Sequence, residues 1–284
     1  MTGSGGPADW PVRQAALEDW LRQRGSVLVA FSGGVDSSYL AAVAHAVLGP
    51  AMRAVHVTSA FVSTREQAFA RELAAGLGLP FQELAIDVLA DPVVAGNPPD
   101  RCYHCKRRIF AALQGLAREL GLAGVVDGSQ ADDSDEHRPG RRALRELGVD
   151  SPLAQCGFTK ADVRAASTAR SLPGSQRPSM SCLATRFPYD SPLSAAGLAQ
   201  VERVEDFLAA AGFADYRARH HGTVVRIELD PADLARAVEP ELAQRLVRAS
   251  RQAGFAFAAL DLAGYRSGSF DHARAAADRE GDHG

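Results

Sequence analysis

Residues 32–38, with the sequence SGGVDSS, combine residue types that suit phosphate chemistry. Gly33 and Gly34 allow the backbone to turn without a Cβ clash, so that successive N–H groups can point into one concavity. The same short run supplies hydroxyls and one carboxylate, at Ser32, Asp36, Ser37 and Ser38. Hydroxyls and backbone amides bind phosphate oxygens, and a carboxylate can hold Mg2+. The run is therefore predicted to be a phosphate-binding loop, although it lacks the lysine of the GxxxxGK[ST] loop.

The cysteines are the second group of residues with chemical potential. Cys102 and Cys105 form a CxxC pair, and thiolates at this spacing fall on one side of a turn and can reach one metal ion or one cluster. Burial of both as small hydrophobic residues is the alternative. Cys182 lies in a proline-bounded, hydroxyl-rich loop over 177–190, and Cys156 is expected to be a packing residue. A zinc site made of all four is disfavoured, because the second pair lacks CxxC spacing.

Acidic residues follow a short apolar run at 123–129. The segment from Gly128 reads GSQADDSDE, and it carries Asp132, Asp133, Asp135 and Glu136. These residues could form a solvated acidic loop. Because they follow a strand of the same predicted sheet as Ser32, they are better interpreted as neighbours of Mg2+ or the nucleotide.

The elements that must position these residues alternate between strand and helix. Strands are predicted at 27–31, 51–58, 81–86 and 123–129, and helices at 10–24, 63–77, 102–120 and 159–169. This alternation predicts βαβ units and a parallel sheet, with the ligand at the carboxyl ends of the strands.

The chain after Pro188 reads as a smaller α+β domain. A helix at 194–211, two strands within 216–229, a helix at 231–254 and a strand at 255–264 give the order αββαβ. Arg217 and Arg219 fall on one face of the first of these strands. They could be an ordinary exposed arginine face or a clamp for a phosphate group. The predicted domains are 1–186 and 187–284.

Length and composition limit the possible partners. The chain has 284 residues and a formal net charge of −3, so it has no basic excess of the kind that drives nucleic-acid binding. No run approaches about 20 apolar residues, which disfavours a membrane span. Four cysteines without a disulfide pattern suit a reducing compartment. We expect a cytoplasmic protein with a small-molecule substrate and without nucleic-acid or membrane partners.

The SGGVDSS run resembles the signature of the PP-loop ATP pyrophosphatases, whose fold is adenine nucleotide alpha hydrolase-like. Together with RCYHCKRRIF, GSQADD, SCLATRFPY and the terminal AGYRSGS, it resembles the LarE family of ATP-dependent sulfur transferases. Ser129 stands where threonine is common. The resemblance implies that ATP adenylates a carboxylate of pyridinium-3,5-biscarboxylic acid mononucleotide, and that sulfur then replaces oxygen in the synthesis of the nickel-pincer nucleotide cofactor.

The resemblance also implies residue roles. Cys182, Asp36 and Glu205 would be catalytic, and Arg217 and Arg219 would bind the substrate phosphate. ATP would be bound by Ser32, Gly33, Gly34, Asp36, Ser37, Ser38, Gly128 and Asp132. Sulfur would come either from Cys182 itself, leaving dehydroalanine, or through a 4Fe-4S cluster on Cys102, Cys105 and Cys182. The cysteine pair favours the cluster. The external sulfur donor is left open, and a homo-oligomer is expected.

Three other functions are weighed. A PP-loop tRNA thiolase would share the adenylation chemistry, but the charge balance disfavours an RNA substrate. An ammonia-using ligase would leave the cysteines unexplained. A nucleotide-binding sensor without catalysis would need Gly33 and Gly34 but has no use for Cys182 in a loop.

Overall fold

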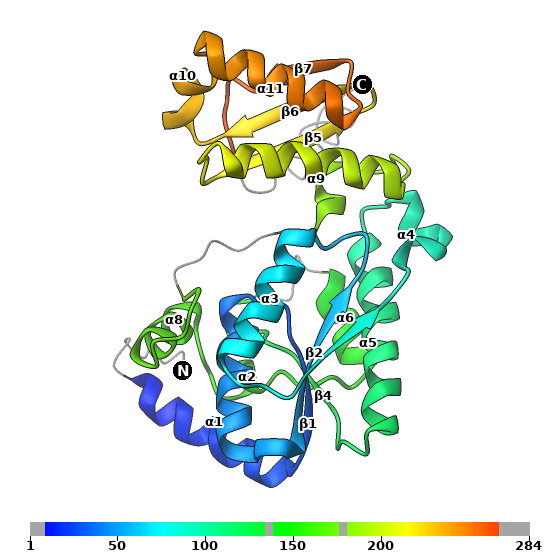
Figure 1. Ribbon diagram of the computed structural model, residues 1–284. Coiled ribbons are helices and arrows are strands. Elements are labelled where there is room, and N and C mark those ends of the chain that lie inside the picture. Colours follow the sequence, from blue (N-terminus) through cyan, green and yellow to red (C-terminus); the bar gives the residue numbers. More distant parts are fainter. Residues whose placement is uncertain (1–8, 134–138, 176–180, 267–284) are drawn as a thin grey trace, which may run out of the picture. The chain divides into compact units, whose positions relative to one another are not determined.

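The computed structural model describes residues 9–133, 139–175 and 181–266 (Figure 1). The predicted acidic residues Asp135 and Glu136, residues 177–180 of the cysteine loop, and 267–269 of the terminal motif lie outside the described residues. The chain separates into two compact units, one of residues 1–88 and 100–181, the other of residues 89–99 and 182–284. The domains 1–186 and 187–284, with their roles, remain a prediction.

The first unit is built on a parallel sheet with the strand order β3-β2-β1-β4. The strands are β1 (Val27–Ala30), β2 (Met52–Thr58), β3 (Phe81–Ala85) and β4 (Val125–Val126). The predicted α/β class with a parallel sheet is confirmed. Only the last strand is much shorter than predicted, because the chain after Val126 leaves β1 to pack against a helix terminus.

Helices cover both faces of this sheet (Figure 1). One face carries α1 (Trp10–Arg24), α2 (Val35–Leu48), α3 (Thr64–Gly76) and α8 (Lys160–Ala169), and the other carries α5 (Arg101–Glu119) and α6 (Pro139–Glu146). Short elements complete the unit: η2 (Gly49–Ala51), η3 (Val88–Ala90, which ends in the second unit) and α7 (Pro152–Gln155).

The strand order places a ligand crevice beside β1. From β1 the chain moves to β2 and β3 on one side, and β4 later joins on the other side. In open parallel sheets such a reversal leaves a crevice at the carboxyl ends of the two strands on either side of it. The segments that follow β1 and β4 are the predicted phosphate loop and the GSQADD run, so the topology brings these two motifs together.

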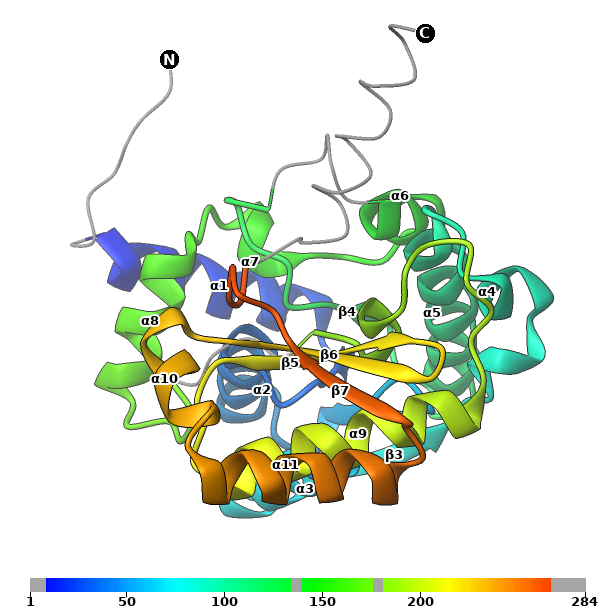
Figure 2. The same cartoon turned by 90° about the horizontal axis from the view of Figure 1, so that it is seen from above.

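The second unit contains a three-stranded mixed sheet with the order β5-β6-β7. Its elements are α4 (Pro92–Gly96), η4 (Leu183–Arg186), α9 (Ala195–Ala210), β5 (Tyr216–His221), β6 (Val224–Leu229), η5 (Pro231–Asp233), α10 (Leu234–Ala237), α11 (Pro240–Ala253) and β7 (Phe257–Leu260). Helices α9 and α11 lie together on one face of the sheet (Figure 2). The helix predicted over 231–254 is interrupted before Pro240, since proline disfavours helical geometry in the residue before it.

Side chains alternate between the two faces of β5. Ala218 is fully buried and packs in the apolar layer with Ile227, its cross-strand neighbour. Arg217 and Arg219 point to the opposite face, as predicted from their spacing. No helix in the described part of the chain combines the length and apolar character that a membrane span requires.

Candidate functional site

The turn between β1 and α2 has the geometry of an anion-binding loop. Gly33 has a φ of +78°, and a Cβ at this position would lie 3.2 Å from Ala70 Cβ. Ser32 N–H donates to Ser37 Oγ at 3.2 Å, and Ser37 Oγ donates to Gly34 O at 3.1 Å. The two serine hydroxyl oxygens are 3.0 Å apart. These bonds close the loop over the first turn of α2, where the helix dipole favours a negative charge.

The GSQADD segment lies directly against this loop. A Cβ at Gly128 would lie 2.9 Å from the backbone nitrogen of Ser37. Just before it, the buried Asp127 accepts hydrogen bonds from Ser129 Oγ at 2.5 Å and from Ser151 Oγ at 2.6 Å. The close approach requires glycine and joins the ends of β1 and β4 into one site.

A lysine that the sequence analysis did not select connects the two motifs. Lys160 Nζ lies 2.5 Å from Asp36 Oδ2, across 124 positions of the sequence. The backbone N–H of Lys160 donates to Asp132 Oδ2 at 2.7 Å. Asp36 and Asp132 were both predicted to bind the nucleotide. Lys160 contacts both of them, Asp36 through its side chain and Asp132 through its backbone.

Several oxygen atoms beside the loop are suited to a ligand. Asp36 Oδ1, Ser38 Oγ and Gln130 Oε1 are buried and have no hydrogen-bond partner among the described residues. Oxygen donors of this kind are the type that Mg2+ prefers. Their chemistry therefore fits a nucleotide with Mg2+. No group of three or more His, Cys, Asp or Glu side chains that could hold a metal ion occurs within the described ranges.

A buried histidine supports the loop from β2. His56 Nδ1 lies 2.9 Å from Phe31 O, and since a carbonyl oxygen only accepts, Nδ1 carries the proton. Burial lowers the pKa of His56 below its usual value, so the ring is neutral at pH 7. The residue helps to fix the chain just before Ser32.

The CxxC pair lies in the first turns of α5. Cys102 is exposed and Cys105 is half-buried, and their i, i+3 spacing places both on one side of the helix. The buried Arg101 donates to Cys102 Sγ at 3.7 Å. The thiolate is the form of cysteine that binds metals.

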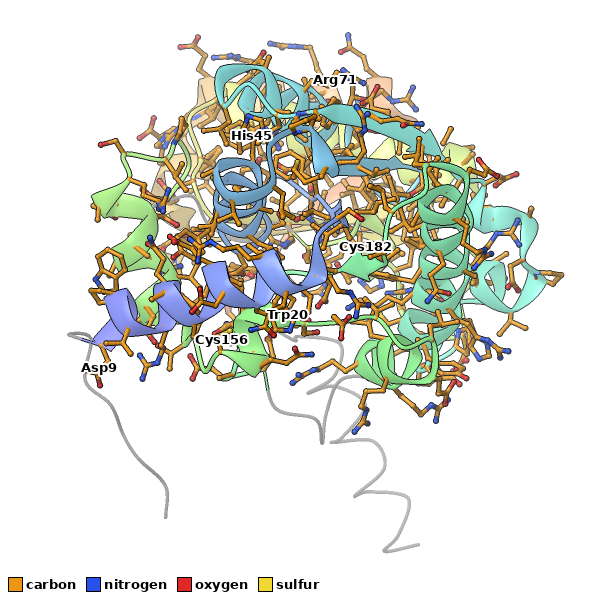
Figure 3. All side chains as sticks on the ribbon, turned by 90° about the horizontal axis from the view of Figure 1, so that it is seen from below. Asp9, Trp20, His45, Arg71, Cys156 and Cys182 are labelled. Atoms are coloured by element: carbon orange, nitrogen blue, oxygen red, sulfur yellow. The ribbon has the colours of Figure 1, made fainter. Side chains whose placement is uncertain are left out.

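Cys156 differs from the other cysteines. It ends α7 and packs against the apolar core of the first unit. Figure 3 shows it beside α1, the helix that carries Trp20. Burial raises the pKa of the Cys156 thiol, which keeps it protonated. These observations favour the predicted packing role.

In the second unit, the backbone of Cys182 is held by the residues that follow it. Its carbonyl oxygen accepts hydrogen bonds from Thr185 N at 3.0 Å and from Thr185 Oγ1 at 2.7 Å. Arg186, which is fully buried, donates to Glu205 through Nε at 2.6 Å and through Nη2 at 3.0 Å. Glu205 Oε1 also accepts from Ala218 N–H at 3.1 Å. Glu205 therefore ties the Cys182 turn to the edge of β5.

The two arginines of β5 are buried, with 6% and 5% exposure, which excludes the exposed arginine face. Arg219 donates to Thr185 O and to Glu228 Oε2, each at 2.7 Å. Arg217 donates to Tyr216 O at 2.6 Å and lies over the ring of Tyr265, but forms no ion pair with a carboxylate of the described residues. Burial, and then the nearby Arg186, lower the pKa of Arg217. A buried arginine with neutral partners is suited to an anionic ligand.

The predicted site residues thus divide between the two units. The first unit holds Ser32, Gly33, Gly34, Asp36, Ser37, Ser38, Cys102, Cys105, Gly128 and Asp132, and the second unit holds Cys182, Glu205, Arg217 and Arg219. Lys160 and Thr185 were missed. Amino-acid composition could have drawn attention to Lys160, because lysine occurs in the sequence at only two positions, 106 and 160.

Comparison with known proteins agrees with this geometry. A family model described as asparagine synthase matches residues 13–122. An uncharacterised protein of Synechocystis is 35% identical over 255 residues, which cover 90% of this chain and 95% of the relative. Pyridinium-3,5-bisthiocarboxylic acid mononucleotide synthase of Lactiplantibacillus plantarum is 35% identical over 255 residues, or 89% of this chain and 90% of the relative.

A more distant relation covers less than half of the chain. The tRNA-specific 2-thiouridylase of Rhizobium etli is 35% identical over 142 residues, but these cover only 42% of this chain and 35% of that protein. The full-length similarity, the parallel sheet and the phosphate loop lead to one conclusion. This chain belongs to the LarE family of ATP-dependent sulfur transferases, within the PP-loop superfamily.

Proposed function

We propose that this protein adenylates a carboxylate of pyridinium-3,5-biscarboxylic acid mononucleotide and replaces oxygen by sulfur, in the synthesis of the nickel-pincer nucleotide cofactor. The full-length similarity to a synthase of the bisthiocarboxylic acid mononucleotide carries the proposal. The loop geometry around Ser37 supports the ATP half of the reaction. A tRNA thiolase remains the alternative function. The similarity to the tRNA-specific 2-thiouridylase covers less than half of either chain, so it supports only the ATP-binding fold.

The proposed reaction has two steps. A carboxylate oxygen of the substrate attacks the α-phosphorus of ATP, and pyrophosphate leaves. A sulfur nucleophile then attacks the carbonyl carbon of the acyl adenylate, and AMP leaves with the former carboxylate oxygen. Adenylation is needed because a free carboxylate resists attack by a nucleophile, whereas AMP is a good leaving group.

Residues of the first unit would bind ATP. Backbone N–H groups at Gly33 and Gly34 and the hydroxyls of Ser32, Ser37 and Ser38 would hold the pyrophosphate portion. Asp36 and Asp132 would hold Mg2+, whose charge stabilises the leaving pyrophosphate. Gly128 would keep the second motif close enough to act on the same ligand.

Residues of the second unit would bind the acceptor and supply sulfur. Arg217 and Arg219 would hold the phosphate of the mononucleotide. Glu205 would act through Arg186, because both of its carboxylate oxygens already accept hydrogen bonds in the structure. Cys182 would be the cysteine of sulfur transfer.

We also propose a 4Fe-4S cluster on Cys102, Cys105 and Cys182. The position of Cys102 and Cys105 on one side of α5 supports two of the ligands, and Cys182 belongs to the other unit. When bound, a cluster with three protein thiolates leaves one iron open to an added sulfide. Thiol chemistry of this kind requires a reducing compartment, so we propose a cytoplasmic location.

A homo-oligomer is proposed as well, and the exposed Phe257 and Leu262 of the second unit support it. The sulfur donor stays open.

The adenylation step is tested by exchange of labelled pyrophosphate into ATP. We expect exchange that requires the mononucleotide acceptor and does not occur with tRNA. Ser37→Ala should weaken exchange. Gly34→Val should abolish it, because even a Cβ there lies 3.3 Å from Ser32 Oγ and the larger side chain would block the loop. Formation of ADP and orthophosphate would contradict the proposal, and exchange supported by tRNA alone would favour the thiolase.

The cluster is tested by iron and sulfide analysis after anaerobic purification. We expect a brown protein that loses iron when Cys102 or Cys105 is changed to serine. Cys156→Ser is the matched control and should keep its iron, because Cys156 packs in the core. A colourless wild type that transfers one sulfur per chain, with Cys182 converted to dehydroalanine, would contradict the cluster. That result would show that Cys182 itself supplies the sulfur.

A further inference from the structure

Lysine is rare in this chain. Of 31 lysine and arginine residues, 29 are arginine, and the two lysines are at positions 106 and 160. One of these two is the residue whose ammonium group reaches the phosphate loop. An arginine has a planar fork that suits carboxylates, whereas a lysine provides a compact point charge on a flexible stem. The use of lysine at position 160 is therefore notable beside a predicted pyrophosphate site.

The backbone of Lys160 is fixed, while its charged group is accessible. Lys160 is the first residue of α8, and Thr159 and Asp162 form a capping box around it. Asp162 is itself paired with Arg13 at 2.8 Å. The side chains of Lys160 and Asp36 are 32% and 25% exposed, so a ligand in solution can reach their ion pair. The helix start is rigid, and only the lysine stem has to move.

The loop needs a cation from elsewhere in the chain. Residues 32–38 contain no basic side chain, and Asp36 adds a negative charge at the place where the phosphates would bind. Asp36 Oδ2 contacts Lys160, while Asp36 Oδ1 is buried without a hydrogen-bond partner among the described residues. One carboxylate thus has an oxygen ready for a divalent cation and another occupied by an exchangeable ammonium group.

We propose that Lys160 is a binding residue for the pyrophosphate portion of ATP. Its ammonium group rests on Asp36 in the nucleotide-free protein and moves to a phosphate oxygen when ATP and its divalent cation take the loop and the carboxylate. The movement neutralises phosphate charge in a loop that has no lysine of its own. The inference rests on the proposed ATP-dependent function.

The binding test compares three variants with the full-length wild type by calorimetry in the presence of Mg2+. Lys160→Gln should raise the Kd for ATP and for inorganic pyrophosphate by about 10- to 100-fold, as loss of one charge-assisted contact implies. The Kd for adenosine should change less than about twofold, and Lys160→Arg should recover part of the lost affinity. Arg164→Gln is the matched control, because it removes one positive charge from the exposed side of the same helix.

A second measurement uses the wild type alone, so it does not depend on a variant that folds. Lys160 and Lys106 carry the only side-chain primary amines in the sequence, so acetylation of amines reports on these two positions besides the N-terminus. Mass spectrometry should show that ATP with Mg2+ slows acetylation of Lys160 and leaves the rate at Lys106 unchanged. Adenosine should protect neither lysine.

The outcomes separate this inference from the proposed function. If the wild type does not bind ATP, both the proposed function and the proposed role of Lys160 are wrong. If the wild type binds ATP and Lys160→Gln binds it equally tightly, the proposed role of Lys160 is wrong, but the proposed function stands. The same holds if Lys160→Gln weakens the binding of ATP and adenosine to the same extent. Lys160 would then form only a structural ion pair. Unchanged acetylation of Lys160 in saturating ATP has the same meaning.

Discussion

Two arginines on the same face of β5 have different electrostatic surroundings. Arg219 is paired with the buried Glu228, so its charge is balanced within the protein. Arg217 has only neutral hydrogen-bond acceptors and an aromatic ring, and the nearby Glu205 offsets the desolvation cost of its burial only in part. A bound phosphate would offset that cost. We therefore expect Arg217 to contribute mainly to ligand binding. Arg219 should contribute both to ligand binding and to the stability of the fold.

Substitution by glutamine should separate these roles. Arg217→Gln should raise the acceptor KM by about 10- to 100-fold and lower the free energy of unfolding by only about 1 kcal/mol, since it loses neutral hydrogen bonds and relieves a buried charge. Arg219→Gln should destabilise the protein by about 3 kcal/mol, because the buried Glu228 loses its ion pair with Arg219. Steady-state kinetics and urea unfolding measure the two effects. An unchanged acceptor KM in Arg217→Gln would remove this residue from the substrate site.

Individual residues could be predicted where a local motif requires them. Gly33 and Gly34 follow from the turn, and the side of β5 occupied by Arg217 follows from strand alternation. The partners of Arg186 could not be predicted, since its bond to Glu205 joins two elements that no sequence pattern pairs. Lys160 was missed for the same reason: its partner lies 124 positions away.

At the scale of elements, the segment after β4 can approach the start of α2 only because residue 128 is glycine. A Cβ at Gly128 would lie 2.9 Å from Ser37 N and 3.2 Å from Ser37 Cα, and backbone atoms cannot rotate away as a side chain can. The two motif segments could then approach only if the strand end or the helix start shifted. The ATP site therefore requires glycine here for reasons of space.

Gly128→Ala should thus weaken ATP binding at least about tenfold, because a shift of a few tenths of an ångström disturbs several loop hydrogen bonds together. Gly115→Ala is the control. It lies inside α5, has open space around its Cβ position, and should stabilise the protein by about 1 kcal/mol through helix propensity. Calorimetry and thermal unfolding measure both variants. Tight ATP binding in Gly128→Ala would show that the junction tolerates a larger separation.

Element types were largely predictable because hydrophobic periodicity and caps are local. Thr159 and Asp162 form a capping box at the start of the helix predicted at 159–169, and the strands of the parallel sheet lie where apolar runs occur. The prediction was less successful where proline acts within an apolar pattern. Pro240 divides the helix predicted over 231–254, and the short helix α4 (Pro92–Gly96) was not predicted.

At the scale of the whole molecule, the chain crosses between its two units more than once. Residues 89–99 belong to the second unit, although residues on both sides of them belong to the first. The fully buried Asn97 explains this grouping, because its side chain donates to Pro188 O and its carbonyl accepts from Asp190 N–H. These contacts join segments that the sequence separates by 91 positions or more, so composition alone could not reveal them.

This interleaving affects the protein during its synthesis. Asn97 leaves the ribosome well before Pro188 and Asp190, and at about 5 to 20 residues per second it waits on the order of 5 to 20 s for them. During that time the side chain of Asn97 lacks its acceptor Pro188 O, and its carbonyl lacks the donor Asp190 N–H. The second unit therefore cannot fold as a purely C-terminal module, and a chaperone that binds nascent chains has its opportunity in this interval.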